Sequence, residues 1–165
     1  MIRRLLRRLY PLAAAKAVHF VFLMLACAGC RTLPPMPAAD LSAPGWNVQH
    51  GQALWTPERG RPELAADLLL ATNVNGSIFC QLTKTPFPLI TARSTQDEWE
   101  IEYAGGAHGW HRRGRPPSRV ACFVLPRALL GAHLGDGWRF EATNSASWTL
   151  KNWRTGEQLE GYLAP

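Results

Sequence analysis

Most of the chain after Gly45 alternates apolar and polar residues with a period of two. The alternation is clearest in DEWEIEY (97–103), where Trp99, Ile101 and Tyr103 are separated by glutamates. A period of two places the apolar side chains on one face of a strand and the carboxylates on the other. The segment therefore predicts a strand of an antiparallel sheet, with one buried face and one solvated face.

Further segments carry the same pattern. Asn75-Gly76 predicts a type I′ hairpin turn that joins 63–73 to 77–83. The alanines and leucines of 63–73 also suit a helix, so two interpretations of that segment stay open. The remaining predicted strands are 46–55, 88–94, 138–143, 147–153 and 158–163.

The segment 115–135 is apolar without alternation. Pro126 followed by Arg-Ala-Leu-Leu-Gly predicts a short helix that begins at Pro126 and ends at Gly131. We expect a mainly β fold, a curved antiparallel sheet or half-open barrel of about seven to nine strands with one or two short helices. Such a sheet either curls round a ligand cavity or closes on side chains and helices.

The N-terminal segment has a different pattern. Four arginines in MIRRLLRRLY and then Lys16 precede the apolar stretch 17–26, which is typical of a secretory signal peptide over 1–29. The uninterrupted apolar part is about ten residues long, and a membrane-spanning helix needs roughly 20. We expect cleavage rather than a permanent span.

The end of this stretch, LMLACAGC (23–30), holds two cysteines. A redox or zinc CxxC pair is expected in a folded context or beside a second ligand pair, and neither follows. Cys27-Ala28-Gly29-Cys30 instead resembles the lipobox of bacterial lipoproteins, which implies acylation of Cys30. Cys27 is the less favoured alternative, because the bulky Leu25 lies two positions before it. The competing interpretations are a secreted protein without lipid and an uncleaved anchor.

Lipidation changes the interpretation of charge. The whole chain has a formal net charge of +6 and 18 Lys and Arg residues, of which five lie in the signal peptide, whereas none of the 12 Asp and Glu residues do. Cleavage leaves a net charge of about +1, which excludes nucleic acid as a partner. Residues 30–44 are proline-rich and predict an extended tether, and 45–165 form a single β-rich domain. Arg31 after the cysteine, rather than aspartate, favours the outer membrane facing the periplasm.

One basic cluster remains in the mature part. HRRGRPPSR (111–119) contains Arg112, Arg113, Arg115 and Arg119. A solvated, exposed loop is the favoured interpretation, and contact with phosphate or anionic lipid is the alternative.

The order of these features, including the step Val124-Leu125-Pro126, resembles the LolA/LolB-like superfamily of lipoprotein-handling proteins. The resemblance covers 45–165 in element order. It implies a half-open barrel lidded by helices that holds the acyl chains of other lipoproteins. LolB-type proteins also present an exposed apolar side chain on a loop between strands, and Val74 is the candidate for that position.

Seven tryptophans are many for this length. Large apolar side chains at alternating strand positions either line a lipid cavity or fill a small core, and both interpretations stay open. The cavity-lining candidates are Trp46, Trp55, Trp99, Ile101, Tyr103, Trp138 and Trp148.

Catalytic patterns are weak, and we expect neither an enzyme nor a bound metal or cofactor. His108 and His111 have an HxxH spacing among loop glycines, with no evident third ligand. No G-x-S-x-G motif is present in the sequence. Cys80 and Cys122 lie in apolar runs as small buried hydrophobes, and a disulfide between them is an open alternative in an oxidising compartment.

The favoured hypothesis is therefore a membrane-anchored envelope lipoprotein that binds lipid or acyl chains in a half-barrel and aids lipoprotein sorting or insertion. The alternative is a structural or adaptor lipoprotein that binds an envelope protein without a lipid cavity. An enzyme with a cleft near His108 and His111 is the least favoured.

Overall fold

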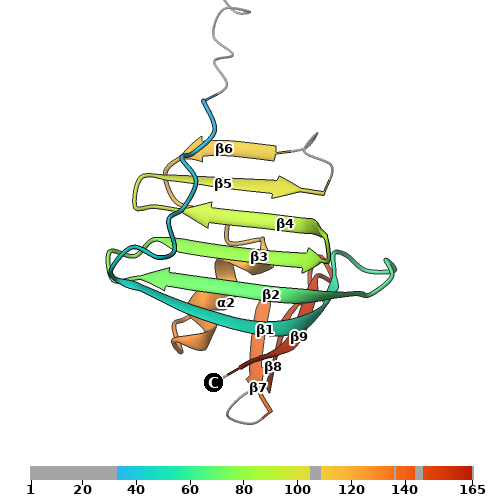
Figure 1. Ribbon diagram of the computed structural model, residues 1–165. Helices are drawn as coiled ribbons and strands as arrows, with labels where there is room; N and C mark the ends of the chain where they lie inside the picture. Colours follow the sequence, from blue (N-terminus) through green and yellow to red (C-terminus); the bar gives the residue numbers. More distant parts are fainter. Residues whose placement is uncertain (1–32, 105–108, 136, 144–146, 165) are drawn as a thin grey trace, which may run out of the picture. The chain divides into compact units, whose positions relative to one another are not determined.

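The computed structural model describes residues 33–104, 109–135, 137–143 and 147–164. These residues form nine strands in one sheet, together with one helix (Figure 1). The elements are β1 (Trp46–Thr56), β2 (Leu64–Asn73), β3 (Ile78–Lys84), β4 (Phe87–Ser94), β5 (Glu98–Tyr103), β6 (Gly109–Arg113), α2 (Ala121–Leu129), β7 (Trp138–Ala142), β8 (Ser147–Asn152) and β9 (Gln158–Leu163).

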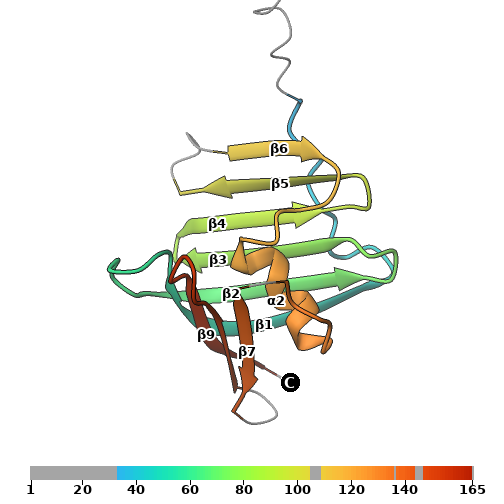
Figure 2. The ribbon, with the colours of Figure 1, turned by 180° about the vertical axis from the view of Figure 1, so that it is seen from behind.

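The sheet is antiparallel throughout, with the strand order β6-β5-β4-β3-β2-β1-β9-β8-β7. It is curved and does not close, so β6 and β7 are its edges. Helix α2 and the strands β7–β9 lie on the same side of β1–β5 (Figure 2). The prediction of a mainly β fold with a curved antiparallel sheet is confirmed.

The core lies between α2 and the sheet face that it covers. Alternate residues of β2, among them Leu68 and Leu70, point to this face and are buried, as are Leu82, Ile90 and Ile101 from the next strands. Seven of the nine residues of α2 are buried. Burial of such side chains contributes roughly 1.5–3 kcal/mol each, which holds the helix against the sheet.

Two predictions about local structure need correction or resolution. Residues 64–73 form a strand, not a helix, because their burial alternates with a period of two. The predicted bounds of the helix are wrong, because α2 begins at Ala121 and contains Pro126 in its interior. Proline removes one backbone hydrogen bond there, but the almost complete burial of an apolar segment outweighs that loss.

The turn between β2 and β3 is also different from the prediction. A type I′ turn needs positive φ at both central residues, whereas Gly76 (φ 86°) has positive φ and no described non-glycine residue does. The backbone N–H of Gly76 donates to the carbonyl oxygen of Asn73 at 2.9 Å. Asn75 therefore keeps a negative φ, and the left-handed position is given to the glycine that follows it.

The region around β5 departs from the expectation of a solvated acidic face. Glu100 is only 5% exposed, and its Oε2 accepts a hydrogen bond from Nε of Arg93 at 2.7 Å. Residues 109–113, expected within a glycine-rich loop or hairpin, form the edge strand β6. Glu100 is paired with Arg93, and β6 lies beside β5. The glutamates of β5 therefore do not lie at the edge of the sheet.

The tether prediction is corrected over part of its length, since residues 34–37 lie against this face. The Pro34 carbonyl oxygen contacts Nδ1 of His111 on β6, and the Pro37 carbonyl oxygen accepts from Nη1 of Arg93 at 3.0 Å. Met36 between them is buried. The segment crosses from β6 toward β3 on the side opposite α2 (Figure 1), so it is docked rather than free.

Two glycines allow β9 to pair closely with β1. A Cβ at Gly51 would collide with the carbonyl oxygen of Tyr162, and one at Gly161 would collide with that of Gln52. The pairing covers only Gly51–Thr56 of β1. The backbone N–H of Ala164 donates to the His50 carbonyl oxygen at 2.7 Å, and before His50 no described strand pairs with β1 on that side. This opening positions the pocket described next.

Candidate ligand pocket and docked tether

A pocket of about 770 Å³ lies between the C-terminal end of α2 and the strands that curl over it. Its volume falls within the range of about 300–1,000 Å³ that is typical of small-molecule sites. Its lining is Asn47 and Gln49 of β1, Leu70 and Thr72 of β2, Pro126, Leu129 and Leu130 at the end of α2, Phe140 and Ala142 of β7, Ser147 and Trp148 of β8, and Leu163 and Ala164 at the end of the chain.

The fold explains why this space is open. Because β9 leaves β1 at Gly51, the core-facing side chains Asn47 and Gln49 lie against the pocket rather than against another strand. The helix ends at Leu129, too early to fill the space, and Leu130 at the rim is 81% exposed. The result is an apolar space with a hydrophobic side chain at its mouth.

Trp148 lines this pocket and also the second pocket described below. Its side chain is buried, and among the described residues its indole Nε1 finds no hydrogen-bond acceptor. A buried donor without a partner costs about 1–3 kcal/mol. Nε1 is closed to solvent in the structure, so a ligand oxygen would remove that cost only after a side-chain shift that opens the indole to the pocket.

The predicted cavity residues differ in where the structure places them. Trp148 lines the pocket and belongs to the same buried cluster as Trp55, Ile101 and Trp138, which do not line it. Two further candidates pack against the core, and Trp99 makes an edge-to-face contact with Phe123 of the helix at 5.9 Å between ring centroids. The second of these two is Tyr103. The remaining candidate, Trp46, is half-buried.

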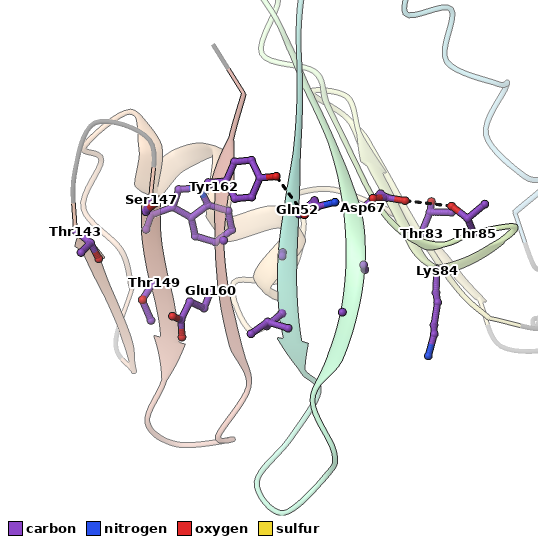
Figure 3. Close-up of a pocket in the computed structure, with 16 residues that line it drawn as sticks. Gln52, Asp67, Thr83, Lys84, Thr85, Thr143, Ser147, Thr149, Glu160 and Tyr162 are labelled. Carbon is purple, nitrogen blue, oxygen red and sulfur yellow. Dashed lines mark hydrogen bonds between the residues drawn. The ribbon is translucent and has the colours of Figure 1, made fainter.

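A second, smaller pocket of about 520 Å³ lies on the opposite face of the sheet (Figure 3). Its lining combines apolar residues, among them Leu54 and Trp148, with polar side chains that make two hydrogen bonds to one another. The Tyr162 hydroxyl donates to Oε1 of Gln52 at 3.1 Å, and the Thr85 hydroxyl donates to Asp67 at 3.1 Å. The pocket beside α2 differs from it in size and in its leucine-rich lining, which includes Leu70, Leu129 and Leu163.

A buried carboxylate lies at the other end of α2. Oε1 of Glu157 accepts hydrogen bonds from Nε1 of Trp55 at 3.3 Å and from the backbone N–H of Ala121 at 3.4 Å. Burial raises the pKa of Glu157 to about 7, although both hydrogen bonds act in the opposite direction. The residue caps a helix whose own N-cap, Val120, supplies no side-chain bond.

Cys80 and Cys122 meet in the core below this carboxylate. Both are buried free thiols in the structure. A side-chain hydrogen bond with Cys80 and burial together raise the pKa of the Cys122 thiol well above its usual value. Protonated thiols of this kind are poor nucleophiles, and the disulfide between them stays a prediction.

The exposed candidates lie at two places on the sheet. Val74 is 92% exposed at the tip of the β2–β3 turn. Arg112 and Arg113 are exposed on β6, and Arg115 is exposed just after it. The predicted basic loop is therefore in part an edge strand.

Several predicted features fall outside the described residues. The signal peptide, Cys27, Cys30 and His108 belong to this group. Within the described part of the chain, no group of three metal-binding side chains comes together. No described helix has the length and apolar character needed to cross a membrane.

Comparison of the chain with protein-family models and with curated protein sequences finds no match.

Most residues of the pocket have no sequence pattern that marks them as a site. Leu129, Leu130, Phe140 and Leu163 lie in segments predicted as helix or strand, and no pattern assigns them to a site. The apolar Ala-Leu-Leu directly before Gly131 indicated only that a helix ends there. Only the structure shows that β9 leaves this space open.

Proposed function

We propose that this protein is an envelope lipoprotein, anchored through Cys30, that binds an acyl chain in the pocket between α2 and β7–β9. The observation that carries the proposal is the mainly apolar lining of this pocket, which includes Trp148, whose buried Nε1 has no hydrogen-bond acceptor among the described residues. An acyl ester has a hydrocarbon part that suits Leu129, Phe140 and Leu163 and an oxygen that suits the indole donor. Acyl-chain binding in a curved sheet also agrees with the resemblance to LolB-like proteins.

The exposed Val74 supports a role in handing lipid to a membrane or receiving it. Val74 is 92% exposed at the turn tip, and a single exposed apolar side chain is common on protein surfaces. Together with the pocket, it fits a protein that aids lipoprotein sorting or insertion at the outer membrane. The acyl chains of another lipoprotein are the proposed cargo.

The test is binding of a fluorescent fatty acid to the purified protein. We expect saturable binding to wild type, and about fivefold weaker binding to Trp148→Phe, which keeps an aromatic ring but removes the donor. Trp153→Phe is the matched control, because Trp153 is exposed and lies away from the lining residues. Absence of saturable binding to wild type would refute the acyl-binding role.

The anchor is tested separately by mass spectrometry of the mature N-terminal peptide. Acyl groups on Cys30 are expected, and Cys30→Ala should release the protein from the membrane fraction. A mature chain that begins elsewhere without acyl groups would refute the anchor. Capture of one dominant envelope protein, together with no bound lipid, would favour the adaptor alternative.

A further inference from the structure

The docked tether limits how far the domain can lie from a lipid anchor. Pro34 is held at β6 through His111, and only residues 31–33 separate it from Cys30. At about 3.3–3.6 Å per residue, four fully extended steps span at most about 14 Å. A lipidated Cys30 therefore keeps the β6 edge close to the headgroup region, whatever the conformation of residues 31–33.

The surface at that edge suits such a position. Trp110 on β6 is 48% exposed, and its ring rests edge-to-face on Tyr103 at 5.8 Å between centroids. Tryptophan is enriched at the membrane–water interface, where its ring is apolar and its N–H is polar. The contact with Tyr103 holds the ring at the edge of the sheet rather than in the core.

Three exposed arginines follow Trp110 along the same edge, Arg112 and Arg113 on β6 and Arg115 in the following loop. Within the described residues none of the three forms an ion pair. Arg112 donates to the His111 carbonyl oxygen, which leaves its charge uncompensated. Cationic side chains without protein partners, beside an exposed tryptophan, are complementary to anionic headgroups.

We infer that Trp110, Arg112, Arg113 and Arg115 form a membrane-contact edge, which binds anionic phospholipid headgroups of the bilayer that holds Cys30. This inference rests on the proposed anchor but not on the acyl-binding pocket. The acyl pocket is lined by α2, β1, β2 and β7–β9, while β6 is the other edge of the sheet. None of the residues that line the pocket belongs to β6, so contact at β6 does not cover them directly.

The test uses the full lipidated protein reconstituted into vesicles of phosphatidylcholine, with or without phosphatidylglycerol. Both preparations contain a phospholipid brominated near the top of its acyl chains, which quenches tryptophan at the interface. The fluorescence difference between wild type and Trp110→Phe reports Trp110 alone. We expect this fluorescence to be quenched in the anionic vesicles and recovered at high salt, because screening weakens exposed electrostatic contacts.

Replacing the arginines by serine in Arg112→Ser/Arg113→Ser/Arg115→Ser should weaken the contact about a hundredfold, at about 1 kcal/mol per basic side chain. The control Arg61→Ser/Arg139→Ser/Lys151→Ser removes the same charge from exposed positions away from β6, and it should be quenched like wild type. Equal loss of quenching in both triple variants would overturn the specific edge.

Flotation of the vesicles separates the two proposals. A protein that floats with the vesicles while Trp110 stays unquenched in the anionic preparation keeps its anchor and overturns the membrane-contact edge. A protein that does not float has no lipid anchor, and the membrane-contact edge is then overturned together with the anchor.

Discussion

Glu157 caps helix α2 from outside the helix, since its Oε1 accepts a hydrogen bond from the backbone N–H of Ala121 at 3.4 Å. The carboxyl is buried, and burial raises its pKa to about 7 from the ordinary value of 4.5. The folded state therefore holds a proton that the unfolded state releases between these two pH values. The stabilising contribution of Glu157 is complete below pH 4.5 and is lost as the pH rises through about 7.

We predict that Glu157→Gln removes the loss of stability that wild type shows as the pH rises through about 7. The pKa shift from 4.5 to about 7 corresponds to roughly 3 kcal/mol. The difference in free energy of unfolding between the variant and wild type, measured by urea titration, should shift in favour of the variant by about this amount from about pH 4 to about pH 8. Parallel pH profiles for the two proteins would show that the carboxyl is ionised in the folded protein at neutral pH.

Gly161→Ala tests the close approach of β9 to β1. A Cβ at this position meets the Gln52 carbonyl oxygen and the Ala53 side chain, so we expect a loss of about 1–3 kcal/mol in the free energy of unfolding. Gly135→Ala is the matched control, because a Cβ added there would have no other atom within 4 Å. It should change stability by less than about 0.5 kcal/mol.

Met36→Ser tests the docked tether. Loss of its buried side chain should release residues 34–37 from β4–β6, since the apolar contact contributes about 1.5–3 kcal/mol. Hydrogen exchange at the backbone of residues 36–43 should accelerate, while β2 and β3 keep their protection. Ala38→Ser changes an exposed position of the same segment, and exchange as fast in that variant as in Met36→Ser would contradict docking through Met36.

The buried thiols provide a test of the open disulfide alternative. The mature protein that we propose retains only Cys80 and Cys122 as cysteines able to react, since Cys30 is blocked by its thioether. In the native state we expect no reaction with a thiol reagent, because both side chains are buried and burial holds the pKa of the Cys122 thiol high. After unfolding without reductant, two reactive thiols would show the free pair, and none would show the disulfide.

The sequence predicted the sheet well, because period-two alternation survives wherever one face packs and the other meets solvent. The sequence did not predict β6, because Gly109 and the neighbouring arginines show no alternation of apolar and polar residues. That strand forms through its pairing with β5. The helix bounds were wrong for a related reason. Pro126 usually begins a helix, but complete burial of Ala121–Leu125 extends α2 ahead of it.

The candidate site was less accessible to sequence reasoning. A tryptophan at an alternating strand position has the same pattern whether a helix covers it, as at Trp55, or a pocket adjoins it, as at Trp148. The difference comes from where β9 leaves β1 and where α2 ends, both of which are tertiary relationships. The docking of Pro34 and Met36 was hidden in the same way, because a proline-rich segment has no periodicity that reveals a partner.

Native mass spectrometry of the lipidated protein, released gently from membranes, tests the central claim most directly. We predict that wild type carries an additional lipid beyond its own anchor, and that Ala142→Trp, which places a large ring from an exposed position into the pocket, carries none. Ala142→Ser should retain the lipid. Wild type without additional lipid, or equal lipid in wild type and Ala142→Trp, would contradict acyl binding in this pocket.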